Sequence, residues 1–237
     1  KTSQGIVLPP DGSAVSPPLE PNEPDEKLFL TVDKDNVLQI IRSLTRPAYY
    51  HQSMTATLYW AEGQVEKTID LYCRGTVVKA VIQEPGQTKS MLSDGQTVYV
   101  WYDGDETAFQ TQLQPGATLE ELLGIPTYET VLSLPEDAVI EASYLTLGDA
   151  EPTACIYLSC RLTPDGYTDR YWIDVKNQML YRADAQFKDE QFYAVQQTAI
   201  TVYSENDDTV TWDFKLPDGT EPFSKALTEI ETPQPSE

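Results

Sequence analysis

The sequence is poor in cysteine, histidine and basic residues, and it has no long apolar run. Its three cysteines and single histidine show no C-x-x-C or other zinc-ligand spacing, so we expect no metal. Lysine and arginine number 16 against 38 aspartates and glutamates, and the net charge of -22 excludes general affinity for nucleic acid. No stretch approaches the roughly 20 apolar residues of a membrane span, and no signal peptide is visible.

Motifs of known chemistry are also missing. There is no phosphate-binding G-x-x-x-x-G-K-[ST] loop and no G-x-S-x-G nucleophile motif. The only histidine, His51, has no recognisable nucleophile beside it, so we expect a structural or surface role. The acidic runs at 103–106 and 205–208 lack the ligand spacing of a calcium loop and are typical of solvated turns. The sequence therefore predicts no catalytic residue, no cofactor and no enzyme.

The cysteine count leaves the redox compartment open. Three is odd, so at least one of Cys73, Cys155 and Cys160 is unpaired or pairs between chains. Cys155 and Cys160 lie five apart in one strand-like run, and this odd spacing places them on opposite faces. A disulfide within that strand is therefore not expected.

What the sequence does contain is enough apolar material for a core, between two acidic ends. Hydrophobic residues make up 40% of the 237 residues and aromatic residues 10%. Residues 1–27 hold six of the 17 prolines and several acidic residues, which is typical of an extended linker or arm. We therefore predict an arm at 1–27, a single domain at 28–220 and an acidic tail at 221–237.

The apolar spacing changes from helical to alternating along the chain. Val37, Ile40, Ile41 and Leu44 predict a helix over 35–44, which Asp33 or Asp35 can cap. Thr118 and Glu121 have the spacing of a capping box for a helix over 118–123, and a second short helix is predicted over 126–132. Period-two alternation and Asp-Gly turns predict the following strands: 53–61, 65–73, 76–83, 88–93, 96–102, 106–112, 138–147, 153–162, 168–175, 179–187, 191–203 and 209–214.

Aromatic side chains fall on both faces of several predicted strands. Tyr99 and Trp101 oppose the face of Val98 and Val100, for example. A sheet with one face in water would alternate polar and apolar residues, so both faces are expected to be covered or to line a hollow. A sheet of about a dozen strands should also curl. We predict an α+β fold: a large curled antiparallel sheet, unclosed and half-barrel-like, with one N-terminal helix and a mid-chain helical insertion on its concave side.

Two stretches, at 93–103 and 171–182, carry a family resemblance. The first reads SDGQTVYVWYD and the second YWIDVKNQMLYR. With the order of elements over about 33–214, they resemble the unclosed β-barrel superfamily of the lipoprotein carrier LolA, which includes LppX-type lipoproteins and RseB-type regulators. The resemblance implies a concave cavity for acyl chains or a surface for a protein partner. The acidic arm resembles that of an extracytoplasmic lipoprotein, anchored in the cell envelope through a cysteine upstream of Lys1.

The sequence thus predicts a binding protein whose ligand is a lipid or another apolar molecule. Aromatic side chains supply large contact areas, and apolar clefts with few polar groups are ordinary ligand sites. The predicted lining of the concave cavity, of at least several hundred Å³, is Tyr59, Trp60, Tyr99, Trp101, Leu119, Leu122, Leu123, Tyr157 and Trp172. The alternative is an interaction or regulatory module that binds a protein partner, or a second copy of itself, without a small ligand.

Overall fold

The computed structural model describes residues 31–148, 152–162, 166–188, 190–205, 207 and 209–224. Residues 1–27 and most of the segment 221–237 lie outside the described residues. The division into arm, domain and tail therefore stays a prediction.

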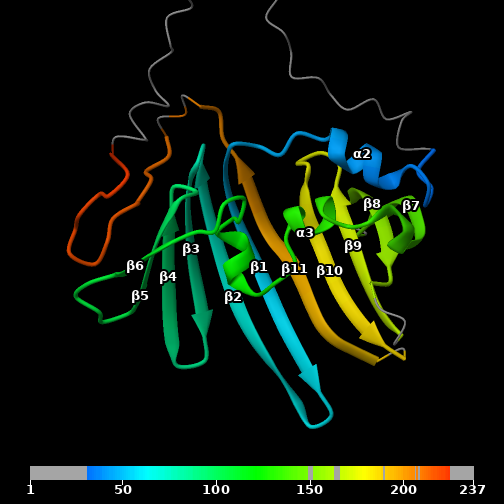
Figure 1. The fold of residues 1–237 in the computed structure, drawn as a ribbon, viewed down its shortest axis with the longest axis horizontal. Coiled ribbons are helices and arrows are strands. Elements are labelled where there is room, and N and C mark those ends of the chain that lie inside the picture. The colour runs from blue at the N-terminus through cyan, green and yellow to red at the C-terminus, as the bar shows by residue number, and fades with distance from the viewer. Residues whose placement is uncertain are drawn as a thin grey trace, which may run out of the picture.

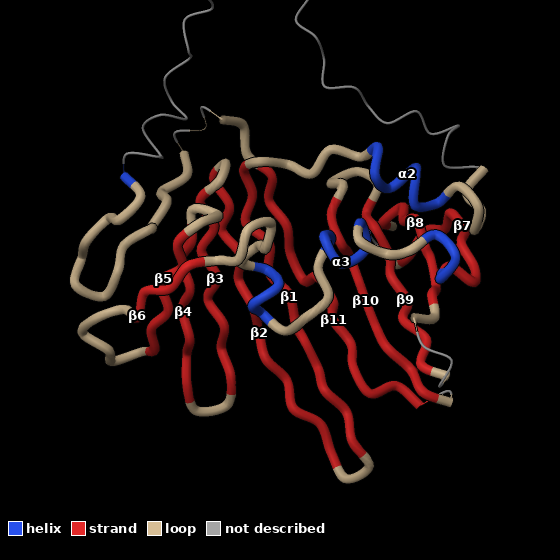
Figure 2. Tube along the Cα trace, in the orientation of Figure 1, coloured by secondary structure: helices blue, strands red, loops and turns tan. Residues whose placement is uncertain are grey.

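The described residues form one 11-stranded antiparallel sheet (Figures 1 and 2). Its strands are β1 (Tyr49–Trp60), β2 (Gly63–Arg74), β3 (Val77–Glu84), β4 (Gln87–Ser93), β5 (Thr97–Tyr102), β6 (Phe109–Gln112), β7 (Val139–Leu147), β8 (Thr153–Cys160), β9 (Tyr167–Asp174), β10 (Met179–Phe187) and β11 (Glu190–Val202). The spatial order is β6-β5-β4-β3-β2-β1-β11-β10-β9-β8-β7. The edge strands β6 and β7 do not pair with each other, so the sheet is unclosed, as predicted.

Turn chemistry explains why neighbouring strands pair. In the β4–β5 hairpin, the Asp94 carboxylate accepts hydrogen bonds from the backbone N–H groups of Gln96 and Thr97 at 2.9 and 2.8 Å. Gly95 adopts φ of 91°, a conformation that costs glycine little. Strands β1–β6 pair in sequence order, and so do strands β7–β11. The long-range pairing of β1 with β11, with Tyr50 opposite Val202, joins these two groups into one sheet.

Four short helices of the described residues lie on one face of the sheet, which we call the concave face (Figure 1). They are α2 (Val37–Ser43), η1 (Glu120–Leu123), α3 (Tyr128–Leu132) and η2 (Glu136–Ala138). Helix α2 buries Val37, Leu38, Ile40 and Ile41, as its apolar spacing predicts. The Asp33 carboxylate accepts from the N–H groups of Asp35 and Asn36, which shapes the turn before the helix. The predicted α+β class is confirmed.

The predicted capping box at Thr118 is wrong. Helix η1 begins after Leu119 without a side-chain cap, and Glu120 at its start pairs with Arg46. A capping box forms instead at the start of α3, where Thr127 and Thr130 bond each other's backbone N–H groups. The prediction identified the helix over 118–123, but the capping box that forms belongs to the next helix, α3.

The predicted strand at 209–214 is also wrong. Residues 209–224, which we call the strap, cross the convex face of the sheet without strand pairing. The rings of Trp212 and Phe214 stack at 5.7 Å, and Phe214 and Phe223 pack on Val77 and Leu92. The alternation that predicts a strand here arises from a segment that packs one side against a sheet.

Both faces of the sheet are therefore partly covered, as the aromatic pattern predicts. On the concave face one cluster joins α2 and α3 to β7–β10, and a second joins Leu119, Leu123 and Ile125 to β1–β5, β10 and β11. A third cluster lies under the strap on the convex face. Beneath the concave helices, a pocket near Met54 and Met179 measures only about 10 Å³. The space between the helices and the sheet is thus filled at this point.

Candidate functional site

The segment between β6 and β7 forms a flap over the concave face. This flap, residues 113–138, carries η1, α3 and η2 and crosses in front of β1, β2, β11 and β10 (Figure 1). Leu119 and Leu123 are at most 4% exposed and pack in the same cluster as Tyr50, Ile69 and Leu71. The flap covers only part of this face, because the ends of β1, β2 and β9–β11 extend beyond it (Figure 2).

A largely buried arginine ties the flap to the chain just before β1. Arg46 donates from Nη2 to Glu120 Oε1 at 2.6 Å, and it also bonds Glu129 and the Tyr50 hydroxyl. The side chains of Arg46 and Glu120 are 20% and 6% exposed. Burial opposes the arginine's charge, but Tyr50 and the two carboxylates outweigh it and raise the pKa of Arg46.

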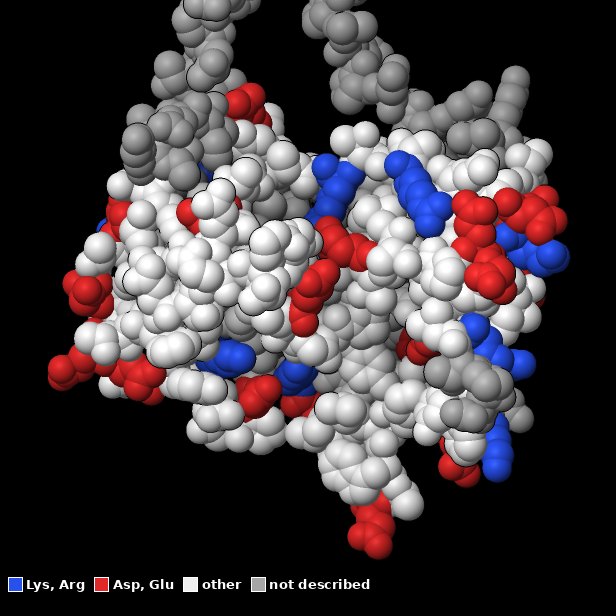
Figure 3. Space-filling view, in the orientation of Figure 1, with Lys and Arg blue, Asp and Glu red and all other residues white. Residues whose placement is uncertain are grey.

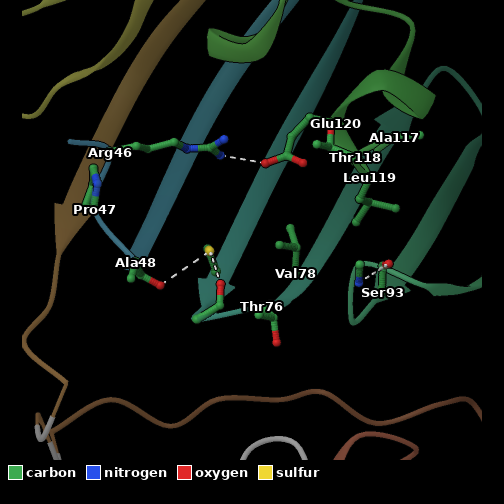
Figure 4. A pocket seen from close by; sticks show the side chains of 13 residues that line it. Arg46, Pro47, Ala48, Thr76, Val78, Ser93, Ala117, Thr118, Leu119 and Glu120 are labelled. Carbon is green, nitrogen blue, oxygen red and sulfur yellow. Dashed lines mark hydrogen bonds and ion pairs between the residues drawn. The ribbon is translucent and has the colours of Figure 1, made fainter. Parts of the chain in front are cut away.

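Next to this arginine lies a pocket of about 270 Å³ with a mixed lining (Figure 4). The Cys73 thiol in its wall points to the carbonyl oxygens of Ala48 and Gly75, at 3.5 and 3.6 Å. Burial raises the pKa of Cys73 to about 11, so the thiolate that would act as a nucleophile is scarce at neutral pH. This pocket therefore offers no reactive group.

The largest pocket near the concave face lies beyond the flap, between the ends of β1 and of β9–β11. It measures about 820 Å³ and is lined by Tyr59, Trp60, Tyr167, Phe187, Glu190 and Phe192, with Ala61 and Gln191. The Tyr167 ring lies 4.7 Å from that of Phe187 and meets the Phe192 ring edge-on at 5.4 Å. We call this the aromatic pocket.

A second pocket lies on the other side of β1. It measures about 370 Å³ and is lined by Ala56, Leu58, Val65, Glu66, Lys67, Glu84 and Pro85. Lys67 donates to the Leu123 carbonyl at 3.1 Å, which places the margin of the flap beside it. We call the two pockets together the open groove. In Figure 3 uncharged surface lies over this end of the face, with both acidic and basic side chains around its margin.

The open groove exposes large apolar side chains to water. Trp60 is 55% exposed, Leu58 46% and Tyr167 43%. Single exposed apolar residues are ordinary, but contiguous apolar patches mark interaction sites in soluble domains.

The nine residues predicted to line a cavity do not lie together. Tyr59 and Trp60 line the aromatic pocket, and Leu122 is 45% exposed on the flap. Leu119 and Leu123 are buried residues of the flap, and Leu119 also lines the pocket beside Arg46. The open groove instead uses Leu58, Val65, Tyr167 and Phe187, which were not in the predicted set.

The other four predicted residues lie on the convex face. Tyr99 packs edge-on against Phe223 of the strap at 5.8 Å, and Trp101 joins the same cluster. Tyr157 and Trp172 are cross-strand neighbours 5.1 Å apart, and the Arg182 guanidinium lies 4.8 Å from the Trp172 ring. The aromatic residues indicated that these strands carry contact surface. They did not indicate on which face of the sheet that surface lies.

His51 lies on the convex face in a polar cluster that differs from a catalytic triad. Its Nε2 atom is 3.1 Å from Asp70 Oδ1 and 3.5 Å from Ser53 Oγ, so both partners contact the same ring nitrogen. In a triad, the acid and the nucleophile contact different nitrogens, so that one nitrogen can accept the proton of the nucleophile while the other donates to the acid. The His51 ring stacks on Tyr72 at 4.3 Å, which accords with a structural role.

Two searches of the described residues were negative. No group of three or more His, Cys, Asp or Glu side chains among them could hold a metal ion. No helix in this part of the chain combines the length and the apolar character needed to cross a bilayer.

No protein-family model and no curated protein matches the sequence. Solved structures with a similar fold include a LolA superfamily protein from Nitrosomonas europaea, with 10% identity and a TM-score of 0.34 over 77% of this chain and 99% of that one. A DUF1329 family protein from Desulfovibrio piger gives 9% identity and a TM-score of 0.33 over 75% and 93%. The MucA/MucB complex of Pseudomonas aeruginosa gives 9% and 0.31 over 76% and 60%. These structures are what the chain is similar to, and its own strand order establishes the unclosed sheet.

Proposed function

We propose that this protein binds an apolar ligand, the acyl chain of a lipid, in the open groove beyond the flap. The observation that supports this most directly is the exposure of Leu58, Trp60 and Tyr167 at a pair of pockets on the concave face. From the predicted site residues, the proposal keeps Tyr59 and Trp60 as lining. Leu122 is assigned to the flap margin, and Leu119 and Leu123 to anchoring the flap.

Burial of these side chains by a ligand would release free energy. Full burial of one large apolar side chain contributes about 1.5–3 kcal/mol, and aromatic rings add contact area at little conformational cost. The space near Met54 and Met179 is filled and the pocket beside Arg46 measures only about 270 Å³, so we place the ligand along the larger open groove. An acyl chain suits such a surface because it has no hydrogen-bond donor or acceptor that would need a partner.

The test uses the full chain with monopalmitin, a neutral single-chain lipid, and native mass spectrometry. We expect a bound lipid in the wild type and at least about tenfold weaker binding in Leu58→Gln, since tenfold corresponds to about 1.4 kcal/mol. The matched control is Phe109→Gln, because Phe109 is 70% exposed on the distant edge strand β6. Absence of binding in the wild type, or an equal loss in the control, would overturn the proposal.

A second candidate is pairing with a protein through the edge strand β7. This strand has nine residues, Val139–Leu147, with no proline or lysine and Glu141 as its one charged residue. Unprotected edges of this length pair with other strands, whereas β6 is protected by having four residues. Analytical ultracentrifugation of the wild type and Ser143→Pro tests self-pairing. A wild-type protein that stays monomeric at all concentrations would count against pairing with a second copy.

Envelope anchoring and the absence of catalysis complete the proposal. The anchor rests on the acidic arm at 1–27, which lies outside the described residues. Metabolic labelling of the native protein with an alkyne fatty acid tests it, and failure to label would contradict a lipid anchor. The convex location and triad-unlike contacts of His51 support a binding protein over an enzyme.

A further inference from the structure

We propose that the aromatic pocket binds an organic cation, specifically a quaternary or fully methylated ammonium group. With the rest of the open groove it would then take a cationic amphiphile, and this extension rests on the proposed function. The head group would occupy the aromatic pocket while the chain follows Leu58 and Val65.

The first observation is the composition of the pocket wall. Trp60, Tyr167, Phe187 and Phe192 bring aromatic rings from β1, β9, β10 and β11 to this wall; Tyr59 also borders the pocket, but alternation in β1 turns its ring to the opposite face from Trp60. The face of an aromatic ring carries negative electrostatic potential and attracts a cation within about 6 Å of its centroid. Several rings around one space form the kind of cage that recognises quaternary ammonium groups.

The second observation is the charge of the pocket. Among the described residues that line it, Glu190 is the only charged one. The chain's net charge of -22 also raises the local concentration of cations around the molecule. Glu190 and the net charge of the whole chain would repel a carboxylate or phosphate head group, whereas the exposed ammonium of Lys188 beside Phe187 would attract one.

The third observation is an ammonium group already seated on one of these rings. The Nζ atom of Lys188 lies 5.0 Å from the centroid of the Phe187 ring. Lys188 is exposed, so its flexible side chain can leave when a ligand cation arrives. The protein itself thus uses this aromatic surface to hold a cation.

The shortage of hydrogen-bond acceptors selects the type of cation. A primary ammonium or a guanidinium carries three to five N–H donors that need acceptors on leaving water. Apart from its tyrosines, the pocket lining offers acceptor side chains only from Glu190 and Gln191 among the described residues. A trimethylammonium group has no N–H donor, so it leaves water with no unpaired donor.

The experiment compares three amphiphiles with matched twelve-carbon chains below their critical micelle concentrations. They are dodecyltrimethylammonium, neutral monolaurin and anionic laurate, each titrated calorimetrically into the full chain. We expect the trimethylammonium compound to bind about tenfold more tightly than monolaurin, and laurate to bind most weakly. Choline should compete with the trimethylammonium compound but not with monolaurin bound along Leu58 and Val65.

Two variants locate the preference, and both change exposed side chains. Trp60→Leu keeps an apolar surface but removes a ring, and Glu190→Gln removes the charge while keeping the shape. Each should reduce the preference for the cation over monolaurin several-fold. The matched control is Glu106→Gln, an exposed carboxylate on the β5–β6 connection, which should leave the preference unchanged.

The outcomes separate this inference from the proposed function. Equal binding of the cation and monolaurin would overturn the cation site alone and leave the apolar groove supported. A preference that survives both pocket variants, or that falls equally in Glu106→Gln, would also overturn it, since general charge attraction would then suffice. If none of the three compounds binds, both proposals fail.

Discussion

Replacing Arg46 by methionine should destabilise the fold strongly, because it leaves carboxylates of the flap without their partner. Arg46 is the common partner of Glu120 and Glu129, and the three side chains are 20%, 6% and 23% exposed. Removing one partner of a buried ion pair costs about 3–5 kcal/mol. Some solvent reaches Arg46 and Glu129, so we expect the lower end of that range, about 3 kcal/mol.

Urea denaturation followed by tryptophan fluorescence measures this loss. With a slope of about 2 kcal/mol per molar, the midpoint should fall by about 1.5 M. The triple variant that adds Glu120→Gln and Glu129→Gln should recover part of the loss, because no buried charge is then unpaired. The control Lys215→Met breaks an exposed pair with Glu221 and should cost under about 0.5 kcal/mol. A loss below about 1 kcal/mol in Arg46→Met would refute the reasoning.

Three further predictions concern stability and reactivity. Burial and Asp184 raise the pKa of Asp169, which disfavours its charged form in the folded state, so Asp169→Asn should increase stability at pH 7 by less than about 1 kcal/mol. This gain should vanish as pH falls below about 4, and a constant gain across that range would contradict it. Burial raises the pKa of each thiol, so the three free cysteines should react with a disulfide reagent in urea but not in the native protein at pH 8. Phe223→Ala should cost about 3 kcal/mol in urea unfolding, whereas a loss under about 1 kcal/mol would show that the strap does not pack as described.

The parts of the fold that local chemistry determines could be predicted from the sequence. The Asp94-Gly95 turn fixes its own hairpin, and the spacing from Val37 to Leu44 marks a helix with one apolar face. The start of β1 was missed, since the prediction began at residue 53 and the strand begins at Tyr49. Gln52 hides this start, because it is polar yet buried and bonds Leu180 and Gln197 across the sheet.

The features that long-range contacts determine could not be predicted. Glu120 pairs with Arg46, which lies 74 residues away in the sequence. The local pattern predicts Thr118 as the cap of this helix, but η1 has no side-chain cap. Alternation assigns Tyr99 and Trp101 to one face of their strand but does not say which layer covers that face. Leu58, Val65, Tyr167 and Phe187 of the open groove could not be predicted, because their exposure depends on how far the strands extend beyond the flap.

Photo-crosslinking tests the central claim, an apolar ligand in the open groove, most directly. A monoacylglycerol with a diazirine in its acyl chain is irradiated with the full chain, and labelled peptides are mapped by mass spectrometry. The account predicts adducts on residues 56–65 and 187–192, and competition by unlabelled monopalmitin. Adducts confined to the strap at 209–224, or no adduct that unlabelled lipid can compete away, would contradict it.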